Sequence, residues 1–192
     1  MGVVFGLIRV RPEDVAVLRD RPEAVEAFMN GDLAIPQPGG GGFLSRLFGG
    51  KPPEGDAHVP ARRNDDDIDL DKSWHVIHYL LTGSIERTDS PLSLIADNRD
   101  PLADIDLGMG KPSVIAPADV KAFAAAVASL TDDDFLARFD AQKMPSRELY
   151  MGDVAAEAND EFKEYVLEYF HELRDFARTA ADAGDALLTS YG

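Results

Sequence analysis

The stretch from Asn159 to about Ala183 constrains the fold most, because it predicts one long amphipathic helix. At about 100° per residue, its apolar side chains gather on one face. That face carries Phe162, Tyr165, Tyr169, Leu173, Phe176 and Ala180. The opposite face, which we expect to meet water, carries Glu164, Glu168, His171 and Asp175. A helix with such a face is stable only when another element covers its apolar side.

Shorter runs predict the elements that pack with this helix. Apolar and β-branched residues favour strands at 3–10, 113–115 and 186–191. Helices are predicted to begin at Pro12 and to span 22–29, 72–81, 117–130 and 131–139. Thr131, followed by three aspartates, is a suitable N-cap for the last of these. We therefore expect an α+β fold in which helices, about half of the chain, pack on a small mixed β-sheet.

The residues from Gly31 to Gly55 interrupt this pattern. Glycine and proline make up 12 of these 25 residues, a composition that buries too little apolar surface to offset the entropy of ordering. We interpret about 31–66 as a flexible loop inside a single domain of residues 1–192. An apolar island at 43–48, Phe-Leu-Ser-Arg-Leu-Phe, either docks on the core of the protein or engages a partner.

The charge of the chain limits its partners. Nineteen Lys and Arg against 35 Asp and Glu leave a net charge of −16, which repels nucleic-acid phosphates and anionic lipids. We therefore expect neither nucleic acid nor membrane as a partner. Cysteine is absent, and the first residues lack the pattern of a signal peptide, so the expected location is the cytoplasm. The acidity either maintains solubility or forms a docking face for a basic protein.

Several motifs fail on their spacing. Gly49-Gly50-Lys51 and Gly108-Met109-Gly110-Lys111 resemble phosphate loops, but a proline follows each lysine where a magnesium-binding hydroxyl is required. Asp65, Asp67 and Asp69 alternate as in a calcium loop, yet Leu70 replaces the necessary glycine. We interpret the aspartates as a solvated segment that caps the next helix. Glu168 and His171 have metal-ligand spacing, but no second such pair exists.

The helix predicted at 72–81 carries the one constellation that suggests a site. Its buried stripe is predicted to hold Leu70, Trp74, Ile77 and Leu81, with a polar edge beside it. The candidate binding edge comprises Asp71, Trp74, His75, His78, Tyr79 and Thr82. Two imidazoles beside a carboxylate could hold a divalent metal or orient a general base. The alternative is structural: histidines that bond backbone carbonyls, or an Asp71–His75 pair at i, i+4. We expect no resident metal and no cofactor.

The sequence also resembles a known family. Leu70-Asp-Lys-Ser-Trp-His-Val-Ile-His-Tyr-Leu-Leu-Thr-Gly83 is similar to the characteristic segment of the YfbM-like family, domain of unknown function 1877. The likeness continues through Gly108–Val120, Phe139–Met144, Leu149-Tyr150 and Tyr165–Leu188, while the stretch at 36–55, Met109 and Met151 depart from it. The resemblance implies a bacterial domain of helices and sheet, commonly a small stand-alone protein. It implies no activity and therefore no catalytic residue.

Two functions of different classes follow from these observations. The leading expectation is a non-catalytic cytoplasmic binding or interaction protein with an acidic surface, one form of which neutralises a basic protein partner. The alternative is a metal-dependent or general-base hydrolase built on Asp71, His75 and His78. No Gly-x-Ser-x-Gly, Ser-x-x-Lys or His-Glu-x-x-His motif is present, which favours the first.

Overall fold

The computed structural model describes residues 2–31, 60, 62, 66–95, 98–107, 110–140, 142, 144, 148–157 and 159–192. The predicted loop at 31–66 falls almost wholly outside these residues, as do its apolar island and the Gly49-Gly50-Lys51 motif. Met109, one of the residues that depart from the family resemblance, is also outside them.

A four-stranded sheet in the order β2-β1-β4-β3 forms the centre of the protein. The strands are β1 (Phe5–Val10), β2 (Asp67–Asp69), β3 (Val114–Ile115) and β4 (Ala186–Tyr191). Every pairing in the described part of the chain is antiparallel, so the sheet is not mixed. Three strands match the predicted ones, and β2 is new.

Strand β2 corrects the interpretation of the aspartate run as a solvated segment that caps a helix. Its residues pair with β1 in the register Leu7↔Ile68, and Ile68 packs against the core. Asp67 and Asp69 remain exposed on either side of it. A single apolar residue between two acids suits an edge strand, because charged side chains discourage pairing with another chain. A three-residue strand is too short for its alternating pattern to be recognised from sequence alone.

The predicted helices are present, and their ends lie within a few residues of the predicted ones. They are α1 (Pro12–Asp20), a 3₁₀ turn (Pro22–Ala24) leading into α2 (Val25–Met29), α3 (Trp74–Thr82), α4 (Pro117–Val127), α5 (Asp132–Leu136), α6 (Gly152–Glu157) and α7 (Asp160–Ala183). Helix α6 was not predicted. Thr131 caps α5 as expected, because its hydroxyl accepts the Asp134 backbone N–H at 3.1 Å. Gly83, with φ of 73°, ends α3 at the predicted position.

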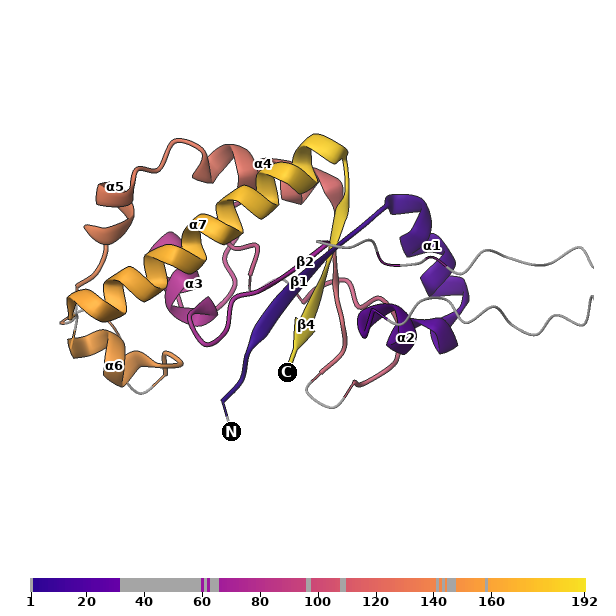
Figure 1. Cartoon of the computed structure of the whole chain (residues 1–192), viewed down its shortest axis with the longest axis horizontal. Helices are drawn as coiled ribbons and strands as arrows, with labels where there is room; N and C mark the ends of the chain where they lie inside the picture. Colours follow the sequence, from indigo (N-terminus) through magenta and orange to yellow (C-terminus); the bar gives the residue numbers. More distant parts are fainter. Residues whose placement is uncertain are drawn as a thin grey trace, which may run out of the picture.

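The two faces of the sheet carry separate apolar clusters. In Figure 1, α3, α4 and α7 lie on one side of the sheet, and α1 and α2 lie on the other. Phe5 and Leu7 of β1 point into the larger cluster, which α3, α4 and α7 complete, whereas Ile8 and Val10 belong to the cluster covered by α1 and α2. The apolar face predicted for α7 is buried or half-buried along its length, and Phe170 stacks on Phe135 with 4.0 Å between ring centroids. The opposite face of α7 is exposed, as predicted, with His171 half-buried.

The Arg9 side chain forms ion pairs with two buried carboxylates at one end of the sheet. The Arg9 guanidinium lies 3.1 Å from the Asp185 carboxylate and 3.5 Å from that of Asp66. All three side chains are nearly buried, with 14%, 3% and 5% exposed in that order. Because these residues come from β1, the turn after α7 and the approach to β2, their attraction joins three segments distant in sequence.

We expect Arg9→Ala to lower the free energy of unfolding by about 3 kcal/mol, because two buried carboxylates lose a shared cation. Urea denaturation measures the change. Arg19→Ala is the matched control: Arg19 bonds Asp100 at 2.6 Å on the surface, where loss of the pair costs less than about 1 kcal/mol. Equal effects of the two substitutions would contradict a structural role for the buried triad.

Candidate functional site

The predicted binding edge on α3 offers no free ring nitrogen at His75, which is half-buried. The imidazole Nε2 lies 2.9 Å from the Ile85 carbonyl oxygen, and Nδ1 accepts the backbone N–H of Tyr150 at 3.0 Å. Since Nδ1 is an acceptor, Nε2 carries the proton and donates it to Ile85. Both nitrogens are therefore engaged by backbone groups, and the ring joins α3 to two loops.

His78 is sealed inside the protein, with none of its surface exposed. Its Nε2 donates to the Glu86 carbonyl at 3.0 Å, while among the described residues Nδ1 has no hydrogen-bond partner. Desolvation lowers the pKa of this imidazole, with a further lowering from neighbouring His75. A neutral ring fits this environment, because a second proton would place an unpaired charge in the core.

The remaining edge residues do not complete a site with the histidines. Tyr79 is half-buried against the core, and the Thr82 hydroxyl donates to the His78 carbonyl at 2.8 Å. The Asp71 carboxylate accepts the Tyr165 hydroxyl at 2.9 Å. The Asp71–His75 pair considered from spacing does not form, because both ring nitrogens of His75 bond backbone groups. In the described part of the chain, no group of three or more Asp, Glu or His side chains is placed to hold a metal ion.

Trp74 and His75 instead pack behind one wall of a neighbouring cleft and hold it in position. The Trp74 indole N–H donates to the Val3 carbonyl at 3.2 Å, and its ring stacks on His75 with 4.8 Å between centroids. The Tyr150 hydroxyl accepts the Val3 N–H at 2.8 Å. These bonds hold the Tyr150-Met151 turn in place, and Met151 within it has a left-handed backbone with φ of 60°.

We call the cleft beside this turn the Asp71 cleft. It has a volume of about 420 Å³ and lies between the start of α3, helix α6 and the first turns of α7. Its lining residues are Asp71, Lys72, Met151, Val154, Asn159, Glu161, Phe162 and Tyr165. The lining therefore combines apolar and charged groups around a space large enough for a long side chain.

Two unusual features meet in the Asp71 cleft. Asp71, with φ of 45°, and Met151 are the non-glycine residues with positive φ in the described structure. Val154, 38% exposed, is its one exposed large hydrophobic residue. Backbone strain of this kind costs on the order of 1 kcal/mol and is most frequent at binding sites. Their convergence distinguishes this cleft from the other hollows on the surface.

Tyr165 keeps its proton in this cleft. Burial raises the pKa of the phenol, and the hydrogen bond to Asp71 and the charge of that carboxylate raise it further. The hydroxyl therefore donates to one oxygen of Asp71, Oδ2. Within the described residues the other oxygen, Oδ1, accepts no hydrogen bond.

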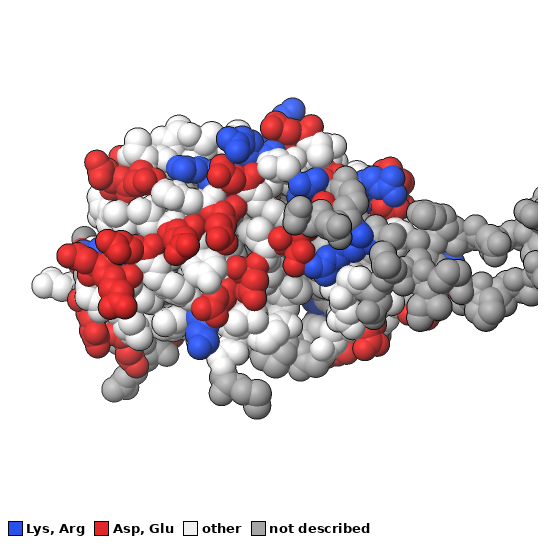
Figure 2. All heavy atoms as spheres, viewed as in Figure 1, with Lys and Arg blue, Asp and Glu red and all other residues white. Residues whose placement is uncertain are grey.

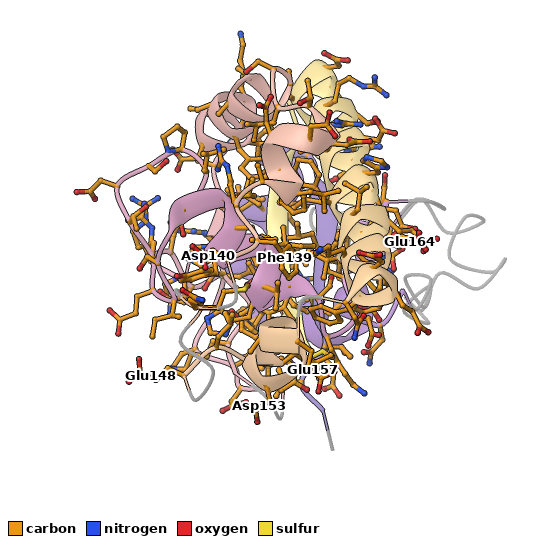
Figure 3. All side chains as sticks on the ribbon, turned by 90° about the vertical axis from the view of Figure 1, so that its left-hand side faces the viewer. Phe139, Asp140, Glu148, Asp153, Glu157 and Glu164 are labelled. Atoms are coloured by element: carbon orange, nitrogen blue, oxygen red, sulfur yellow. The ribbon has the colours of Figure 1, made fainter. Side chains whose placement is uncertain are left out.

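Carboxylates surround the cleft and continue along α7. Between residues 153 and 172 the chain has seven acidic residues and one lysine. We call these seven the acidic face: Asp153, Glu157, Asp160, Glu161, Glu164, Glu168 and Glu172, all of them exposed. Figure 2 shows red carboxylates in a band along α7, and Figure 3 shows Asp153 and Glu157 on the α6 side and Glu164 on the α7 side.

Fold and site together define a small α+β protein in which a charged face with a cleft, and not a histidine pair, is the candidate site. The chain belongs to the family described as a domain of unknown function, DUF1877, whose profile matches residues 1–190. A solved structure, that of the protein of unknown function YfbM from Escherichia coli, is similar in fold. It is 17% identical, has a TM-score of 0.60, and the match covers 97% of this chain and 98% of that one. No curated protein matches this chain.

Sequence reasoning found part of this site. Asp71 was among the predicted residues and lines the cleft. Trp74 and His75 do not line it, but both contact Tyr150, next to Met151 in its wall. Tyr165 was assigned to the apolar face of α7, where its ring does lie, so its bond to Asp71 was not foreseen. Met151 and Val154 were missed because α6 has too short a pattern to predict. The sequence signal for this region is limited to a valine, Val154, within a run of small and acidic residues.

The lowered pKa of His78 makes stability depend on pH. The unfolded chain binds a proton near pH 6.5, but the folded protein does so only at lower pH. The contribution is complete above about pH 6.5 and declines as the pH falls toward the folded-state pKa, by at most about 1.4 kcal/mol per pH unit. Urea denaturation between pH 7 and pH 5 should show this loss in the wild type. His78→Gln, which keeps a donor for Glu86, should show a shallower slope, and parallel slopes would contradict the assignment.

Proposed function

We propose that this protein is a non-catalytic binding protein whose acidic face receives a positively charged protein partner in the bacterial cytoplasm. The observation that carries the proposal is the ratio of seven exposed carboxylates to one lysine over residues 153–172. Lys163 lies 3.5 Å from Asp160, and among the described residues this ion pair neutralises little of the surface. A potential of this sign attracts basic surfaces over roughly a Debye length, or about 8 Å, in physiological salt.

The rigidity of the acidic face supports the same proposal. Five of its seven residues, Asp160 to Glu172, lie on α7, whose buried side is fixed in the larger core by Phe162, Val166, Phe170 and Leu173. Charges on a fixed scaffold lose little conformational freedom when a partner binds. Complementary charge on such a scaffold increases association rate and specificity more than affinity alone.

The alternative hydrolase has less support from the geometry. It needs His75 or His78 to exchange protons with a substrate, but the ring nitrogens of His75 face backbone partners and His78 has no exposed surface. No helix in the described residues is long and apolar enough to cross a membrane. A partner bound through charge is accordingly the function we propose.

A capture experiment with charge-neutral variants tests the proposal. Full-length protein is cross-linked in lysate and partners are quantified by mass spectrometry. We expect the variant with Glu161, Glu164, Glu168 and Glu172 changed to Gln to recover basic partners about tenfold less than wild type. The matched control changes four exposed acids near α1 and α2 to their amides: Glu13, Asp20, Glu23 and Glu26. It should recover the partners at the wild-type level.

Salt provides the second readout. Capture by the wild type should fall by about tenfold between about 50 mM and about 300 mM salt, because exposed charges are screened. Recovery that is insensitive to salt, or a control variant that loses as much binding as the α7 variant, would refute the proposal. Melting temperatures of both variants establish that each is folded.

A further inference from the structure

We infer that the Asp71 cleft is the anchor of this interface and receives one lysine or arginine side chain of the partner. The inference deepens the proposed function and rests on it for the identity of the ligand. It adds a defined subsite, with a chemical class of ligand, to an otherwise diffuse charged surface.

The walls of the cleft suit the aliphatic part of such a side chain. Met151, Val154, Phe162 and Tyr165 present apolar surface to a space of about 420 Å³. Lysine and arginine bury their methylene stems along surfaces of this kind while the charged head remains near polar groups. The methylene stem of the bound residue would cover the exposed surface of Val154. This burial gives Val154 a role in binding, because its side chain is exposed in the free protein.

The polar groups of the cleft suit the cationic head. Asp71 and Glu161 contribute two carboxylates, and Lys72 contributes one ammonium group. Tyr165 uses its hydroxyl to hold Oδ2 of Asp71, which leaves Oδ1 to accept from a guanidinium or ammonium group. The half-buried ring of Tyr165 adds a π face near the same charge, and such a face attracts a cation.

The cleft is preorganised before binding. The backbone of Asp71 is held on both sides, because its N–H donates to Asp69 Oδ1 at 2.7 Å and its carbonyl accepts the Phe5 N–H at 3.3 Å. The opposite wall is fixed by the bond from the Tyr150 N–H to His75. A site that is already formed avoids the ordering cost of an anchor residue, as expected of the few positions that dominate an interface.

Small probes test the cleft directly. The full chain, labelled with ¹⁵N, is titrated with N-acetyl-arginine amide, N-acetyl-lysine amide and the apolar analogue N-acetyl-norleucine amide. We expect the two cations to shift the amide signals of Asp71, Lys72, Val154 and Glu161 in a saturable manner. The norleucine probe should bind at least about fivefold more weakly, because it lacks the charge. Equal binding of norleucine, or cation-induced shifts confined to other regions, would overturn the inference.

Variants separate charge from shape. Asp71→Asn keeps an acceptor for Tyr165 and a residue type that tolerates positive φ, so we expect it to fold and to bind the arginine probe about tenfold more weakly. Lys72→Gln removes the competing ammonium and should tighten binding a few-fold. Glu26→Gln is the control, since Glu26 is exposed on α2 and lies outside both the cleft and the acidic face, and should change little. Unchanged binding by Asp71→Asn at an unchanged melting temperature would overturn the inference.

The failures of the two proposals can be told apart. If the arginine probe binds the cleft but capture from lysate is insensitive to the α7 charges, the cation subsite stands and the proposed function fails. If capture depends on those charges but neither cation binds the cleft, the acidic face stands and the anchor is refuted.

Discussion

The burial of the apolar side of α7 is the interaction on which the rest of this structure depends. Phe162, Phe170 and Leu173 join Phe5 and Leu7 of β1 in the larger core, so the helix fixes the sheet and is fixed by it. Because one side of an amphipathic helix faces the core, its charged side must face solvent. The five acids of the acidic face that lie on α7 are therefore placed at the surface by the burial of the opposite side of the helix.

The same packing explains why the histidines of α3 are structural. His75 and His78 follow Trp74 on a helix that enters the core beside α7, where an unpaired polar group is costly. The loop at Ile85 and Glu86 supplies carbonyls for both rings, and the turn at Tyr150 supplies an N–H for one of them. The imidazoles thus bind two loops to one helix. Asp71, the first residue of the turn into α3, is only half-buried and accepts the Tyr165 hydroxyl.

Prediction from sequence succeeded where a pattern was long. The apolar spacing along α7, the helix predicted at 117–130 and the cap at Thr131 all follow from local patterns, and the structure has them within a few residues. It failed for β2 and α6, each of six residues or fewer. Elements this short are stabilised by what they contact: β2 by its pairing with β1, α6 by the burial of Ala155 in the core. Such contacts join residues distant in the chain and leave no periodic trace.

The sequence by itself determined the α+β class, which side of α7 is buried and which meets water, and the excess of negative charge. These properties follow from composition and from spacing within one element. Only the tertiary structure decided that the rings of His75 and His78 would bond backbone groups and that a cleft would open at Asp71. The physical reason is that both outcomes depend on partners supplied by other segments: backbone carbonyls at 85 and 86 for the rings, and Tyr165 and Met151 for the cleft.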